Sequence, residues 1–276
     1  MANTTETATE KTSEGKNAGL LFSILIAIGI VILLASQVIK TGDRKATDIR
    51  DSSLSAREKV SSYGYNIAIQ TDSMGFIGGN PITVNGSTRR EGVIDMEKKF
   101  MHETVSEDVI GIPEEVIPSR HTRAESYVVN TTLYLKVEDT WLQQEMTEDV
   151  WNQPNLQQKG SVIKGANVML IGTEDFRGEQ AYVLEIRPDL GILMAQVAET
   201  GSTPFLNERL SNEQVQEYVI HEWISKESLL PLKSINKFTL ASDNVTTTMS
   251  VLAEYYDYNK AVNTELPEEA ADAMQM

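Results

Sequence analysis

The longest uncharged stretch of the chain lies near its N-terminus. Asn17–Ile39 (NAGLLFSILIAIGIVILLASQVI) runs 23 residues without a charge, and about 20 apolar residues suffice for a helix to cross a hydrocarbon core about 30 Å thick. A cleaved signal peptide has a shorter apolar core, of about 7–15 residues, and a small-x-small cleavage site that Leu34–Gln37 does not supply. The pattern therefore predicts a retained transmembrane helix that serves as a signal anchor.

After residue 61 the pattern changes to an alternation with period 2, which is typical of strands with one buried face. In 63–69 the tyrosines and isoleucines fall on one face and the other residues on the second face. Turn signals follow at 78–81 (GGNP) and at 85–86 (NG). We expect a meander of antiparallel strands to begin here, whereas 71–125 as a whole favours strands, loops and a lid about equally.

Alternation returns in two later regions. Residues 127–137 predict one strand with Leu133 and Leu135 on its apolar face, with a polar second face typical of a sheet covered on one side. Residues 244–258 predict another, with Met249 and Val251 on the apolar face. Short turns separate 217–225, 232–240 and 244–258, which should therefore pair antiparallel.

Two segments interrupt the strands. Residues 155–164 predict a helix with sparse apolar positions, and a second helix should begin at Pro188, because apolar residues then recur at i, i+3, i+4 and i+7. Between the two helices, 168–186 predicts a hairpin. The fold class is thus α+β, a mostly antiparallel sheet with helices. The apolar stripe of the second helix comprises Leu190, Leu193, Met194 and Val197.

The charge balance is acidic. The chain of 276 residues has a net charge of −16, and nearly all of it follows the predicted span. Sequence-independent binding to nucleic acid needs clustered Lys and Arg that release counterions from phosphates, so nucleic acid is excluded as a partner. The chain has no cysteine, which excludes disulfides, thiolate nucleophiles and Cys-ligated zinc.

Catalytic and metal-binding motifs are missing from the sequence. His102, His121 and His221 are scattered and form no H-x-x-x-H or H-E-x-x-H pair. Nucleophile-elbow, P-loop, dinucleotide-binding and EF-hand patterns do not occur. We therefore expect a protein that is not an enzyme, with no catalytic residues, no metal and no cofactor.

Two signals disagree on the orientation of the span. Two lysines precede it and four basic residues follow it within 40–50, which by the positive-inside rule would keep the C-terminal domain in the cytoplasm. Three Asn-x-Ser/Thr sequons, at Asn85, Asn130 and Asn244, instead suit a secreted, glycosylated surface. We expect a single-pass protein of the cell membrane with its C-terminal domain outside.

Three stretches resemble the LolA/LppX-like superfamily of outer-membrane lipoprotein carriers. Tyr218–Lys233 (YVIHEWISKESLLPLK) looks like the hairpin pattern W-I-[SD]-K-x-[ST]-x-L-P-x-K of these proteins. Gly178–Ile186 resembles the preceding strand, and Tyr255–Glu269 resembles the closing strand and tail, Y-x-x-Y-N-x-x-V-x-x-x-L-P-E-E. The resemblance covers about residues 60–270. The chain departs from the family in its N-terminal span and in an insertion from Thr104 to Thr122.

The resemblance implies a curved, open half-barrel with helices across its concave face and an apolar space between them for acyl chains. The helix residues Leu190, Leu193, Met194 and Val197 would then face the sheet across a cavity. The alternative is that these side chains form an ordinary core. On the sheet side the cavity would be lined by Leu133, Leu135, Met249 and Val251.

These patterns divide the chain into a polar N-terminal tail (1–16), the span (17–39), a polar stalk (40–61), a β-rich domain (62–266) and an acidic tail (267–276). Two functions of different class fit this organisation. One is a membrane-anchored extracytoplasmic protein that binds lipid or another apolar ligand. The other is a structural cell-surface or pilin-like subunit that associates with itself or with a surface protein and has no small-molecule ligand.

Overall fold

The computed structural model describes residues 45–77, 79–115, 117–151, 163–189, 214–241 and 245–275. The predicted transmembrane helix, Asn17–Ile39, lies outside these ranges, as do the predicted helix at 190–197 and most of the one at 155–164. Across the described ranges, no helix has the length and apolar character needed to cross a bilayer.

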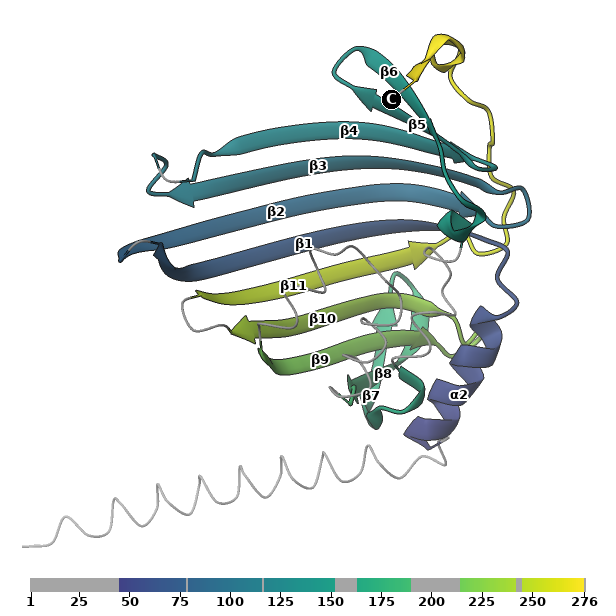
Figure 1. The fold of residues 1–276 in the computed structure, drawn as a ribbon. Helices are drawn as coiled ribbons and strands as arrows, with labels where there is room; N and C mark the ends of the chain where they lie inside the picture. Colours follow the sequence, from purple (N-terminus) through teal and green to yellow (C-terminus); the bar gives the residue numbers. More distant parts are fainter. Residues whose placement is uncertain are drawn as a thin grey trace, which may run out of the picture. The chain divides into compact units, whose positions relative to one another are not determined.

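The described strands form one twelve-stranded sheet in the order β12-β6-β5-β4-β3-β2-β1-β11-β10-β9-β8-β7. Every neighbouring pair is antiparallel except β12 and β6, which are parallel. Figure 1 shows a curved sheet, open because β12 and β7 are its two edges. The elements are α2 (Ala46–Arg57), β1 (Ser62–Ile77), β2 (Asn80–Asp95), β3 (Phe100–Ile112), β4 (Arg120–Val129), β5 (Thr132–Val137), β6 (Thr140–Glu145), η1 (Glu148–Trp151), β7 (Asn167–Phe176), β8 (Glu179–Arg187), β9 (Gln214–Ser225), β10 (Pro231–Ala241), β11 (Val245–Tyr256), η2 (Glu268–Asp272) and β12 (Met274–Gln275).

The register assigns side chains to the two faces of the sheet. Ile67, Ala253, Ser234 and Glu222 are successive cross-strand partners from β1 to β9, and partners directly opposite each other point to the same face. Glu222 binds Arg57 of α2. We therefore call the side of these residues the helix-bearing face and the other side the opposite face.

Helix α2 packs against the β7–β9 end of the sheet. Ile49, Ser53 and Arg57, spaced four residues apart, form its buried stripe. The compact unit of the chain begins at Lys45. The predicted polar stalk, 40–61, therefore contains a helix that belongs to this unit. The apolar spacing looked irregular because a serine and an arginine supply two of the three buried positions. Ile49 joins a core cluster with Ile163, Ala166, Leu184, Ile186, Ile220 and Ile224.

The C-terminal residues also pack on the sheet. In the predicted acidic tail, 267–276, Ala270 is fully buried in a cluster on the opposite face with Phe100, Tyr127 and Trp141. Met274–Gln275 then pair with β6 to form the edge of the sheet. The acidic composition is compatible with packing because Ala270 and Ala273, which follow the two glutamates, belong to the apolar cluster.

Two turn assignments differ from the sequence patterns. Residues 127–137 are predicted as one strand, but Asn130 has a positive φ of 57° and the chain folds back there, so that Val128 pairs with Leu133. The predicted turn at 85–86 is absent, because Gly86 lies inside β2 and pairs with Thr71 on one side and Val109 on the other. The GGNP signal does mark the β1–β2 connection, where Gly79 has φ 84°.

A second core cluster on the helix-bearing face is built from tyrosines. Tyr63, Tyr65 and Tyr255 are all at most 7% exposed, as the alternation in β1 and β11 predicts. Asn259, directly after this cluster, donates its backbone N–H to Ser62 and accepts the N–H of Ser61 through Oδ1. The Y-x-x-Y-N motif thus ties the end of β11 to the start of β1.

We expect the buried tyrosines of this cluster, together with Tyr127 of the cluster on the opposite face, to make the protein sensitive to alkali. Burial raises the pKa of Tyr127 to about 12 and also raises the pKa values of Tyr63, Tyr65 and Tyr258. The unfolded chain, with tyrosine pKa values of about 10, loses these protons first, so stability is complete below pH 10 and falls as pH rises beyond it. Thermal unfolding midpoints should drop steeply above pH 10. Complete ionisation of all tyrosines near pH 10 in the folded protein, seen by tyrosinate absorbance, would contradict this.

Candidate functional site

A cavity lies between α2 and the helix-bearing face of the sheet. Its volume is about 180 Å³. One wall comes from α2 and Ile163, and the other from β1, β9, β10 and β11. The lining is mainly apolar and aromatic, as expected of a site for an apolar group. The lining side chains are Arg57, Ile67, Ile163, Tyr218, Ile220, Glu222, Pro231, Ser234, Asn236, Val251, Ala253 and Tyr255.

The lining of this cavity includes a buried ion pair. Arg57 Nη2 donates to Glu222 Oε2 at 2.7 Å, and the two side chains are 3% and 5% exposed. Arg57 also donates to Ser53 Oγ, 3.3 Å away. The pair joins α2 to β9 and places polar groups beside an otherwise apolar space. Sequence reasoning missed it because the two residues are 165 positions apart.

The structure separates the predicted cavity residues. Val251 lines the cavity, and Met249, two residues earlier on β11, points to the same face. Leu133 and Leu135 are also on the helix-bearing face, as their partners Val128 and Ser126 show. They are five strands from β11, about 24 Å along the sheet, and so do not share this cavity. Leu190, Leu193, Met194 and Val197 lie outside the described residues.

A polar network occupies the helix-bearing face between these two groups. Arg90 binds both carboxylate oxygens of Glu103, at 2.9 and 2.7 Å, and Tyr65 Oη donates to the same carboxylate at 2.6 Å. Glu103 is only 6% exposed. Its charge is therefore balanced and hydrogen-bonded within the sheet.

The predicted glycosylation sites can be placed in part. Asn85 in β2 and Asn130 in the β4–β5 turn are both exposed, which is the accessibility a glycan needs. Asn244 lies outside the described residues. Glycosylation itself stays a prediction.

The histidines form carboxylate pairs on the opposite face. The Nε2 atom of His102 is 3.0 Å from Glu125, and the Nδ1 atom of His121 is 2.5 Å from Asp108. The third, His221, has its Nε2 atom 3.3 Å from a carboxylate oxygen of β8. In the ranges that the structure describes, no three His, Asp or Glu side chains gather as a metal site.

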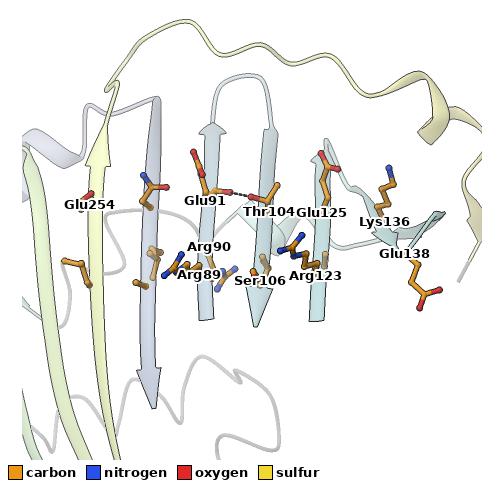
Figure 2. Close-up of a pocket in the computed structure, with 16 residues that line it drawn as sticks. Arg89, Arg90, Glu91, Thr104, Ser106, Arg123, Glu125, Lys136, Glu138 and Glu254 are labelled. Atoms are coloured by element: carbon orange, nitrogen blue, oxygen red, sulfur yellow. Dashed lines mark hydrogen bonds between the residues drawn. The ribbon is translucent and has the colours of Figure 1, made fainter. Parts of the chain in front are cut away.

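The opposite face carries a larger, open groove of about 740 Å³, which crosses β11 and β1–β5 (Figure 2). The sequence patterns did not predict this groove. Its residues come from six strands, and only the pairing of those strands brings them together. Its lining is rich in charged and hydroxyl side chains, including Arg89, Ser106, Arg123, Glu91, Thr104 and Glu125.

Comparison with solved structures finds similar chains at low sequence identity. LprF from Mycobacterium bovis is 12% identical, over 80% of this chain and 96% of that one, with a TM-score of 0.45. The lipoprotein LppX of Mycobacterium tuberculosis is 13% identical, over 80% and 98%, with a TM-score of 0.42. A putative outer membrane lipoprotein-sorting protein domain from Vibrio parahaemolyticus is 12% identical, over 79% and 94%, with a TM-score of 0.20. Two of these names, LppX and the lipoprotein-sorting domain, are those of the group that the sequence resembles. No family model and no curated protein matches the chain.

Proposed function

We propose that the protein is a membrane-anchored, extracytoplasmic binding protein that takes up lipid or another apolar ligand on its helix-bearing face. The observation that carries this proposal is the apolar cavity between α2 and the sheet. In this proposal Asn17–Ile39 anchors the chain in the membrane and the β-rich domain lies outside the cell.

The cavity suits one end of an elongated ligand. Its 180 Å³ is smaller than the roughly 300–1,000 Å³ of a typical small-molecule site, so the rest of the ligand would follow the apolar side chains of the same face, such as Ile69 and Met249. Apolar ligand surface gains about 25 cal/mol for each Å² removed from water. Ser234 and Asn236 supply polar groups that can orient the bound end.

We propose binding rather than catalysis at this site. The two buried carboxylates of the helix-bearing face, Glu222 and Glu103, each have an arginine partner. Protonating either carboxylate would remove the countercharge of its arginine, which makes both poor general acids or bases. An activity screen of the purified chain against ester and phosphoester substrates would overturn this part of the proposal if it found turnover that Glu222→Gln abolishes.

The ligand can be detected by native mass spectrometry of the full chain, purified from its own host in a mild non-ionic detergent. We expect a stoichiometric lipid adduct. Replacing Val251 with tryptophan should remove the adduct, because the indole fills the cavity. The matched control is Thr248→Trp, at an exposed position on the opposite face of the same strand, which should keep the adduct. Equal adduct in both variants, with equal unfolding temperatures, would place the ligand elsewhere.

The surface-subunit function is the second candidate, and exposed apolar side chains favour it. These side chains lie on β1 and β3, the two strands that flank β2, and Thr83 of β2 pairs with both Met74 and Ile112. The four, each more than half exposed, are Met74, Phe76, Ile110 and Ile112. The same mass spectrum separates the two functions. An apo chain that forms multimers would favour the subunit, whereas a monomer with bound lipid favours the binding protein.

A further inference from the structure

The groove on the opposite face contains a cationic row. Arg89, Ser106 and Arg123 are successive cross-strand partners on β2, β3 and β4, and Figure 2 shows the three side by side. Neighbouring strands are about 4.8 Å apart, so the two arginine Cα atoms are about 10 Å apart. Ser106 thus lies between the two arginines in the row.

These two arginines differ from every other arginine in the described ranges. Within those ranges, neither Arg89 nor Arg123 has a carboxylate at ion-pair distance or any other side-chain partner. This difference is informative because an acidic chain offers many carboxylates, and each of the six other arginines in the described ranges forms an ion pair with one. Their pairs are Arg50–Asp51, Arg57–Glu222, Arg90–Glu103, Arg120–Glu107, Arg177–Glu254 and Arg187–Glu185.

An anionic row runs beside the cationic one. Glu91, Thr104 and Glu125 are the cross-strand partners two residues along the same strands, and they form the upper row in Figure 2. Two residues along a strand correspond to about 6.7 Å. The groove therefore presents positive and negative charge in two parallel rows a short distance apart, with hydroxyl groups in both.

We propose that this groove binds a small zwitterion of the phosphoethanolamine class. Its phosphate would lie between Arg89 and Arg123, because guanidinium groups bind phosphate oxygens with paired, charge-assisted hydrogen bonds. Its ammonium group would lie beside Glu91 and Glu125. The same chemistry occurs in a free metabolite and in a phospholipid head group. The site is on the other side of the sheet from the cavity under α2, so it stands independently of the function proposed above.

The test is isothermal titration calorimetry of the full chain in a non-ionic detergent, with phosphoethanolamine, inorganic phosphate and ethanolamine as separate probes. We expect phosphoethanolamine to bind more tightly than either fragment. The double variant Arg89→Gln/Arg123→Gln should weaken phosphoethanolamine binding about tenfold or more, because it removes the charge-assisted hydrogen bonds. Glu91→Gln/Glu125→Gln should abolish only the advantage of phosphoethanolamine over phosphate.

The matched control is Arg187→Gln, which removes an exposed arginine outside the groove and should leave all affinities unchanged. A fourth probe, dihexanoyl-phosphatidylethanolamine below its micelle concentration, identifies the source. Tighter binding than phosphoethanolamine that Arg89→Gln/Arg123→Gln removes would assign the groove to a lipid head group, because the cavity under α2 is unchanged in that variant. No heat with any probe would overturn the proposal. Unchanged binding of phosphoethanolamine to the folded double-arginine variant would also overturn it. Equal affinity of the unaltered chain for phosphate and phosphoethanolamine would overturn the assignment of the ligand as a zwitterion.

Discussion

Replacing Arg57 with methionine should lower the free energy of unfolding by about 3–5 kcal/mol, because it leaves Glu222 charged, buried and unpaired. Both side chains of this pair are at most 5% exposed, so water cannot take the place of the guanidinium group. The loss should appear as a lower denaturation midpoint in guanidinium chloride with an unchanged slope.

Two further variants distinguish a buried-charge effect from a general weakness of α2. Arg57→Met/Glu222→Leu removes both charges and should recover much of the stability, since apolar replacement of a whole buried pair is often neutral or stabilising. Asp51→Asn breaks the pair with Arg50, in which the aspartate is 60% exposed, and should cost at most about 1 kcal/mol. A double variant no more stable than Arg57→Met would contradict the explanation.

Replacing Leu184 with alanine should cost about 2–5 kcal/mol, the usual range for a buried leucine whose neighbours cannot collapse into the space. Leu184 is 0% exposed and packs in the cluster that joins α2 to β7–β9. Thermal or chemical unfolding of the full chain measures the loss.

The matched control for this variant is Leu252→Ala, at a half-buried position on the opposite face of β11. It should cost about 1 kcal/mol, because little apolar area returns to water. Similar losses for Leu184→Ala and Leu252→Ala would mean that the α2 interface contributes no more than the sheet surface.

Periodicity in the sequence predicted the faces of several strands. The apolar face expected for 244–258 is the helix-bearing face of β11, and the hairpin expected in 168–186 is β7–β8. Its turn is only Arg177–Gly178, both with positive φ, so the strands extend further than predicted. Alternation of apolar and polar residues predicts these faces because it shows which face of a strand is buried. That information is contained in each strand's own sequence.

Local signals failed where pairing with distant residues decided the structure. Asn85–Gly86 is a turn dipeptide by composition, but β2 has partners on both sides there, and their hydrogen bonds outweigh the turn preference. The reverse holds at Asn130, where no Gly or Pro marks the β4–β5 turn. Long strands in 71–125 stayed unassigned because their residues are mostly polar on both faces.

The candidate sites were the least predictable part. Val251 and Met249 were placed on the correct face, but the Arg57–Glu222 pair joins residues far apart in sequence. The row of Arg89 with Arg123 exists only once the register of three strands is known. A pattern within one segment cannot carry information of this kind.

The place of β1 in the sheet has a consequence for how the chain folds. This strand pairs with β2 on one side and with β11 on the other, where Gly64 lies opposite Tyr256. The middle of the sheet therefore requires the first and the last long strands to pair. Such non-local pairing slows folding, because a long loop must close before any contact rewards it. During synthesis, one edge of β1 stays unpaired until β11, which begins at Val245, has emerged. The nascent domain should therefore depend on chaperones that cover this edge.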